Sequence, residues 1–220
     1  MTTTKPSKLH LCLVTFGVII GIVGILHGSA ELLKGTVLVE GHSVKALPDN
    51  WPNESFFTLT QGSPVFSLLT GIPFYALGLL AISASILLIV LSLTVLTISR
   101  LGLLLFFLAS LGIFLFGAGR GTPVAISLPV LIFGIASLLL TTKKTRSEAS
   151  RRRILAGFYI LYLAHVLSWV LFFPGLFILS FYQDIPFWLF LLAFASMPFS
   201  ALGSLTLALM WDRTANETTD

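Results

Sequence analysis

The chain has 220 residues, of which 56% are hydrophobic and only 10% charged, whereas an average soluble domain carries about 25% charged residues. This composition excludes an ordinary soluble fold and indicates one polytopic membrane domain, because no hydrophilic stretch is long enough to build a core of its own. The formal net charge of +4 is concentrated in one loop, so it indicates membrane orientation and not a nucleic-acid partner. The single cysteine, Cys12, excludes an internal disulfide, and the absence of a Cys-x-x-Cys pair argues against thiol redox chemistry.

Long uncharged stretches predict an all-α bundle of six transmembrane helices, since about 20 apolar residues cross a hydrocarbon core of about 30 Å. We expect the spans at about residues 9–33, 71–98, 101–117, 124–141, 154–180 and 186–210. Pro73 favours the first turn of the second span, because proline has no N–H to lose there.

The beginning of the chain also fits a secretory signal peptide. Lys5 and Lys8 precede the apolar run, and the small residues Gly28-Ser29-Ala30 follow it. The run is long for a signal sequence and its glycines fit helix packing, so we expect it to be retained as the first span.

Four glycines in the first span form one narrow seam along the helix: Gly17, Gly21, Gly24 and Gly28. Glycines at this spacing let a second helix approach closely, which a lipid-facing surface does not need. The seam therefore predicts packing either within the bundle or against a second copy of the chain.

His27 and Glu31 lie one helical turn apart at the outer end of the same span, on the side that faces protein more than lipid. Three interpretations are open: hydrogen bonding between helices, a proton or cation site, or a metal site. A metal would need at least a third ligand, and four residues outside the membrane are available for it: His42, Asp49, Glu54 and Asp184.

The loop at residues 34–62 is the longest hydrophilic segment, and we expect it outside the membrane. Two short runs of β-forming residues flank Glu40-Gly41, which predicts a small β-hairpin there.

A glycine-rich connection at residues 117–123 joins the third and fourth spans and carries Arg120 at its centre. We interpret it as a structural turn. Alternatively, Arg120 pairs with Glu31 or Asp184, or meets an anionic ligand at the outer surface.

The loop at residues 142–153 contains six basic residues and one acid, Glu148. The positive-inside rule places it in the cytoplasm, and counting spans from it places both termini there too. All Lys and Arg residues except Lys34, Lys45 and Arg120 then lie inside. A regulatory or partner-binding role of this loop is the alternative to orientation alone.

His165 falls near the middle of the fifth span, where an imidazole needs a hydrogen-bond partner. We expect a neutral histidine that is bonded to a serine or carbonyl of a neighbouring helix. A proton relay or a ligand contact is the functional alternative.

Several of these positions form one pattern: His27-Gly28-x-x-Glu31, Gly35, Gly41, Thr70-Gly71-Ile72 and the loop at 117–123. Over about the first 140 residues, the chain resembles a family of small, uncharacterised prokaryotic multi-pass membrane proteins. It departs from that family at Lys34-Gly35-Thr36, where Gln-Gly-Asn is usual, and at Arg120, which interrupts the glycines. The resemblance implies a helix bundle in a prokaryotic cell membrane and a place for the polar pair, but it implies no reaction.

These observations predict a non-enzymatic membrane protein without a cofactor, surrounded by lipid, that acts in assembly through its glycine seam. It would be a homo-oligomer or a small subunit of a membrane complex. The alternative is a transporter or channel for a small solute or proton, with His27 and Glu31 at its outer mouth. A third reading, an intramembrane metalloenzyme, depends on finding the missing metal ligand.

Overall fold

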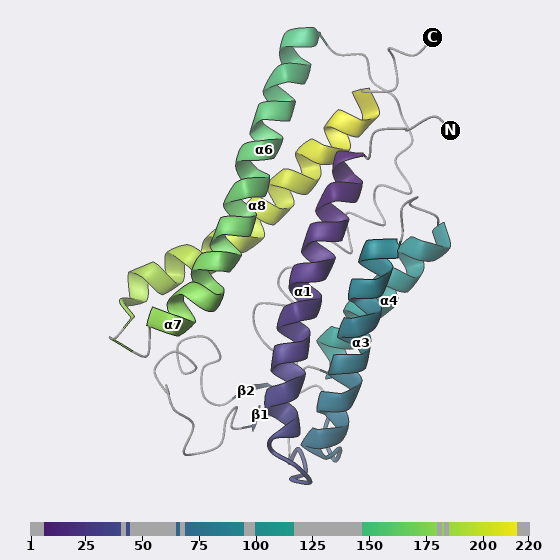
Figure 1. Ribbon diagram of the computed structural model, residues 1–220, viewed down its shortest axis with the longest axis vertical. Helices are drawn as coiled ribbons and strands as arrows, with labels where there is room; N and C mark the ends of the chain where they lie inside the picture. Colours follow the sequence, from purple (N-terminus) through teal and green to yellow (C-terminus); the bar gives the residue numbers. More distant parts are fainter. Residues whose placement is uncertain are drawn as a thin grey trace.

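A computed structural model describes residues 7–40, 43–44, 65–66, 69–94, 100–116, 147–179, 182 and 185–214 (Figure 1). This part of the chain is built almost entirely of helices. The long ones are α1 (Lys8–Leu32), α3 (Phe74–Thr94), α4 (Arg100–Phe116), α6 (Glu148–Val170) and α8 (Phe187–Thr214). The predicted helical bundle is thereby confirmed. The predicted fourth span at 124–141 lies outside the described residues.

Four helical stretches are long and apolar enough to cross a membrane: Lys8–Leu32, Phe74–Thr94, Glu148–Leu176 and Phe187–Arg213. The helix α4 is equally apolar but shorter. Large apolar side chains stay exposed along these helices, as they do where lipid replaces water around a protein.

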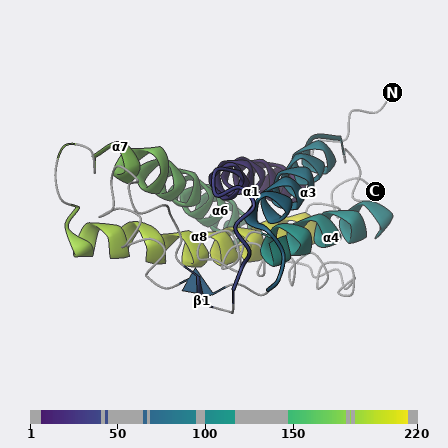
Figure 2. The same ribbon diagram turned by 90° about the horizontal axis from the view of Figure 1, so that it is seen from below.

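The helix α1 lies at the centre of the arrangement (Figure 1). It packs against α3 on one side and α8 on the other, while α4 packs on α3 and α6 packs on α8. Seen along the bundle, α6, α1 and α3 form one layer, and α8 and α4 lie beneath it (Figure 2).

The contacts of α1 fix the direction of α4. Gly17 faces Phe106 and Gly24 faces Ile113, so residue numbers rise together along the two helices. The helices α1 and α4 therefore run parallel, and α4 ends at the same end of the bundle as α1.

The helix α6 also runs parallel to α1. Lys8 Nζ donates a hydrogen bond to Tyr159 Oη over 2.6 Å, and the hydroxyls of Thr15 and Tyr162 are 2.6 Å apart. The helix α6 therefore begins at the end of the bundle where α1 begins, which is the opposite end from the one where α4 ends.

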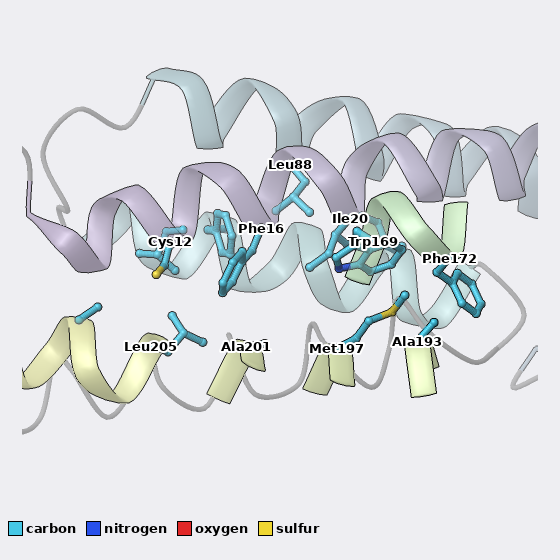
Figure 3. Close-up of a cluster of buried hydrophobic side chains, with 14 of the residues drawn as sticks. Cys12, Phe16, Ile20, Leu88, Trp169, Phe172, Ala193, Met197, Ala201 and Leu205 are labelled. Carbon is cyan, nitrogen blue, oxygen red and sulfur yellow. The ribbon is translucent and has the colours of Figure 1, made fainter. Parts of the chain in front are cut away.

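The apolar core lies where α1 meets the other helices (Figure 3). Fully buried side chains of α1, α3 and α8 contribute to it, among them Cys12, Phe16, Ile20, Leu88, Met197, Ala201 and Leu205. The ring of Phe16 lies against α6, with its centre 4.2 Å from that of the His165 ring and 6.3 Å from that of the Tyr162 ring.

The first turn of α1 is capped from the far end of the chain. Asp212 Oδ1 accepts a hydrogen bond from Lys8 N, and Asp212 Oδ2 accepts one from Leu9 N, both over 2.8 Å. Ser7 Oγ accepts a third bond from His10 N over 3.0 Å. These bonds satisfy N–H groups that have no partner within the helix and join the beginning of α1 to the end of α8.

We expect Asp212→Ala to lower the free energy of unfolding by about 1–2 kcal/mol, because two helical N–H groups lose their acceptor. Thermal unfolding of the purified protein in a mild detergent measures this. Glu148→Ala is the matched control, since this carboxylate is exposed and pairs with Arg152 at the surface. Equal losses in the two variants would contradict a capping role for Asp212.

The helix α6 continues into a π-helical turn, η1 (Leu171–Leu176), and a short helix, α7 (Phe177–Leu179). Pro174 lacks an N–H and would clash with the carbonyl of Val170 in a regular helix, and the wider turn avoids this clash. A Cβ atom at Gly175 would lie 2.9 Å from the Val170 oxygen, so the turn also needs a glycine there.

The start of α6 differs from the predicted fifth span, which began at residue 154. Ser147 caps the helix through Ser150 N, and Glu148 supplies a favourable negative charge in the first turn. Residues 148–153 of the predicted basic loop are therefore helical.

The predicted hairpin about Glu40-Gly41 is wrong. The strand β1 (Ser43–Val44) pairs antiparallel with the distant β2 (Val65–Phe66), and Leu38 forms a bridge with Pro73.

The physical reason lies at the first turn of α3, whose N–H groups need acceptors. Gly35 O accepts from Tyr75 N and Val37 O accepts from Phe74 N, both over 3.0 Å. A local hairpin would not supply these acceptors. Gly35 (φ +64°) and Gly71 (φ +73°) adopt the left-handed backbone that the two connecting segments require.

Candidate functional site

The structure places the glycine seam of α1 against α3. A Cβ atom at Gly24 would lie 2.2 Å from Ser85 Oγ, and one at Gly28 would lie 2.8 Å from the carbonyl oxygen of Gly78. Towards the start of α1, the partners become Ile89 for Gly21 and Ser92 for Gly17. The two helices are therefore antiparallel, and side-chain bulk at the seam would force them apart.

Of the two alternatives for the seam, the structure shows packing within the bundle. The closest approach is between Gly28 and Gly78, where backbone meets backbone. Because α3 already fills this face of α1, the seam offers no free surface to a second chain.

Glu31 lies one turn beyond the last glycine of the seam and is 4% exposed. Neither of its carboxylate oxygens accepts a hydrogen bond in the part of the chain that the structure describes. His27 Nε2 lies 3.5 Å from Glu31 Oε1 and likewise forms no hydrogen bond. The two side chains are therefore neighbours, and His27 Nε2 and both Glu31 oxygens have no hydrogen-bond partner among the described residues.

A buried carboxylate in this situation is energetically costly. Removing a charged group from water costs several kcal/mol unless a partner and hydrogen bonds compensate for it. A proton on either member changes this cost, because Glu31 with His27 is electrically neutral when the two share one proton.

Apolar side chains cover the same end of the helix pair. Val39, Phe74 and Leu77 form a small buried cluster between the end of α1 and the start of α3. The ammonium group of Lys34 lies over the ring of Phe74, 4.1 Å from its centre. Since Gly78, next to Leu77, faces Gly28 and Leu32, this cluster lies at the same end of α1 as Glu31.

No group of three His, Cys, Asp or Glu residues that could hold a metal ion exists among the described residues. The four residues predicted to supply a third ligand lie outside the described ranges, as does Arg120: His42, Asp49, Glu54 and Asp184. In the described part, His27 and Glu31 thus offer a metal two ligands at most.

His165 is fully buried between α6 and α8, and both of its ring nitrogens are bonded. Trp169 Nε1 donates to His165 Nε2 over 3.2 Å, so Nδ1 carries the proton and donates to the carbonyl oxygen of Met197 over 3.0 Å. Ser200 Oγ lies 3.4 Å from the same nitrogen. This geometry matches a neutral, hydrogen-bonded histidine that joins two helices.

Two features of these sites had no usable signal in the sequence. Trp169 follows His165 by one turn, but nothing in the spacing distinguishes a hydrogen bond from ordinary packing. Asp212 is one acid near the end of the chain, and only the fold brings it to the first turn of α1.

The described helices have the length and apolar character of an integral membrane protein. No family model, no curated protein and no solved structure matches the chain. The resemblance to the prokaryotic multi-pass family therefore stays a prediction, and the function has to be argued from the chain itself.

Proposed function

We propose that the protein is a six-span membrane protein with both termini in the cytoplasm, which binds a proton at His27 and Glu31 near the outer surface. The proton site would serve transport of protons, or of a small solute together with protons. The observation that carries this proposal is the buried Glu31 carboxylate, to which no described residue donates a hydrogen bond. Ionisable groups inside membrane segments are costly, which makes a functional role the default hypothesis.

The directions of the helices support six spans. The helix α4 ends at one end of the bundle and α6 begins at the other, as one further crossing between them would require. The sequence predicts the fourth span in this interval, at residues 124–141. The start of α1 and the end of α8 lie together, as an even number of crossings requires.

The distribution of charge supports the orientation. The end of the bundle where α1 begins carries Lys8, Arg100, Arg151–Arg153 and Arg213. The opposite end carries one described basic residue, Lys34. The positive-inside rule assigns the richly basic end to the cytoplasm and the polar pair to the outer side.

A proton fits the site better than a metal cation. Calcium and magnesium take about six or more oxygen ligands, whereas a proton needs one acceptor atom. His27 and Glu31 supply one imidazole and one carboxylate. His27 Nε2 and the Glu31 oxygens form no hydrogen bond to the described residues, so a proton can bind there without breaking a bond in that part of the chain.

Proton flux into liposomes tests this proposal. The full chain is reconstituted with a pH-sensitive dye inside, and acid is added outside. We expect flux through the wild-type protein and its loss in Glu31→Gln. Glu40→Gln is the matched control, because it makes the same chemical change at an exposed carboxylate and should leave the flux unchanged. Equal flux in wild type and Glu31→Gln would overturn the proposed function.

The role in assembly that the sequence first predicted stays a proposal, and the seam no longer supports it. An assembly surface would have to lie on the outward faces of the helices, such as those of Ile160 and Leu163 on α6. Native mass spectrometry in a mild detergent tests for it. A stoichiometric companion or oligomer would favour assembly, and a monomer would oppose it.

A further inference from the structure

We infer that the basic end of the bundle binds the phosphate of an anionic lipid headgroup beside the last turn of α8, with Arg151 and Lys8 as its ligands. This inference concerns the opposite end from the polar pair and does not depend on the proposed proton site.

The two cations lie near the docked ends of α6 and α8, Arg151 against a ring of α8 and the Lys8 ammonium group against a ring of α6. The guanidinium carbon of Arg151 lies 5.4 Å from the centre of the Trp211 ring. The backbone N–H of Lys8 donates to Asp212, and its ammonium group lies 4.9 Å from the centre of the Tyr159 ring. Trp and Tyr rings are enriched at the depth of lipid headgroups, so these contacts place the two cations at that level.

The two acidic residues described at this end, Asp212 and Glu148, already have hydrogen-bond or ion-pair partners. Both oxygens of Asp212 accept from backbone N–H groups of α1. Glu148 pairs with the neighbouring Arg152. Among the described residues, neither Lys8 nor Arg151 therefore has a carboxylate within salt-bridge distance.

The hydrogen-bonding capacity of the two cations is only partly used. Lys8 Nζ donates to a neutral acceptor, Tyr159 Oη, over 2.6 Å. Arg151 Nε is buried and has no acceptor in the part of the chain that the structure describes. A guanidinium binds phosphate through two parallel N–H groups, and a phosphate provides further charged acceptors for the two cations.

The position of the site favours a lipid as the source of the phosphate. Ile160 and Leu163 are more than half exposed on the same helix as Arg151, only two to three turns further along. Exposed apolar side chains of a membrane helix face lipid acyl chains. The cations, near the start of the same helix, therefore lie at the depth of the headgroups of those lipids. Basic pockets between transmembrane helices on the cytoplasmic side bind anionic headgroups in this way.

The test measures the binding of phosphatidylglycerol to the full chain in a mild detergent by native mass spectrometry, with phosphatidylcholine as the zwitterionic reference. We expect preferential retention of the anionic lipid by the wild type. Arg151→Gln should weaken that retention about fivefold, and Lys8→Gln should weaken it as well. Arg152→Gln is the matched control, since it removes the same charge from an exposed side chain that is paired with Glu148, and its retention should stay near that of the wild type.

Three results would overturn the inference. One is equal retention of the two lipids by the wild type. Another is an equal loss in Arg151→Gln and Arg152→Gln, which would indicate diffuse attraction to the whole basic surface. The third is displacement of the lipid by millimolar inorganic phosphate, which would make free phosphate the ligand.

Discussion

Glu31→Gln is expected to raise the stability of the protein, although it removes a charged partner of His27. The wild-type carboxylate is buried and accepts no hydrogen bond from the residues that the structure describes, and the neutral amide avoids the cost of desolvating a charge. We expect a gain of about 1–3 kcal/mol in the free energy of unfolding. For a chain of this length, each kcal/mol raises the midpoint of thermal unfolding by about 2–4 °C.

His27→Gln should act in the opposite direction, because it leaves the buried carboxylate without the imidazole that lies 3.5 Å away. Glu40→Gln, at an exposed position, should change the midpoint little. If Glu31→Gln lowered the stability as much as His27→Gln, the two residues would be a structural ion pair. A gain in stability together with lost flux would instead identify a carboxylate that is retained for function.

Gly78→Ala is expected to destabilise the protein more than any other glycine substitution in the described helices. The new methyl carbon would lie 2.5 Å from the carbonyl oxygen of Gly28 and 3.0 Å from the backbone nitrogen of Leu32. Backbone atoms cannot rotate away, so the helices α1 and α3 would have to separate along the seam. We expect a loss of at least about 1–3 kcal/mol, measured by thermal unfolding in detergent.

Gly203→Ala is the matched control for this substitution. A methyl carbon there would lie 2.5 Å from Cδ1 of Leu161, the end of a flexible side chain that can change rotamer. Alanine also favours a helix over glycine by about 1 kcal/mol, so this variant should be close to neutral. Similar losses at both positions would show that the contact between backbones is not the cause.

The sequence predicted the parts of the fold that depend on local pattern. Long apolar runs located α1, α3, α4 and α8 to within a few residues, and the glycine spacing identified the face of α1 that another helix covers. The sequence could not predict which helix packs on the glycine seam, because the same glycine spacing suits α3 and a helix of a second chain equally well. The hairpin prediction failed for a related reason. The carbonyl groups of residues 35 and 37 accept hydrogen bonds from the first turn of α3, and local β propensity does not predict such contacts with a distant helix.

The candidate site was predicted in part. Helical spacing placed His27 and Glu31 side by side and towards protein. The unused hydrogen-bonding capacity of Glu31 depends on every neighbour in the folded chain, so no spacing rule could predict it. The same holds for Arg151, whose stacking on Trp211 requires α6 and α8 to be docked.

The cap that Asp212 provides has a consequence for biosynthesis. The ribosome makes Lys8 early but makes Asp212 204 residues later, after all the other described helices have emerged. Until then, two N–H groups in the first turn of α1 lack their native acceptor, and that turn depends on water or lipid headgroups for hydrogen bonds. Closure of the bundle at this end therefore belongs to the last stage of folding, when the final helix enters the membrane beside the first.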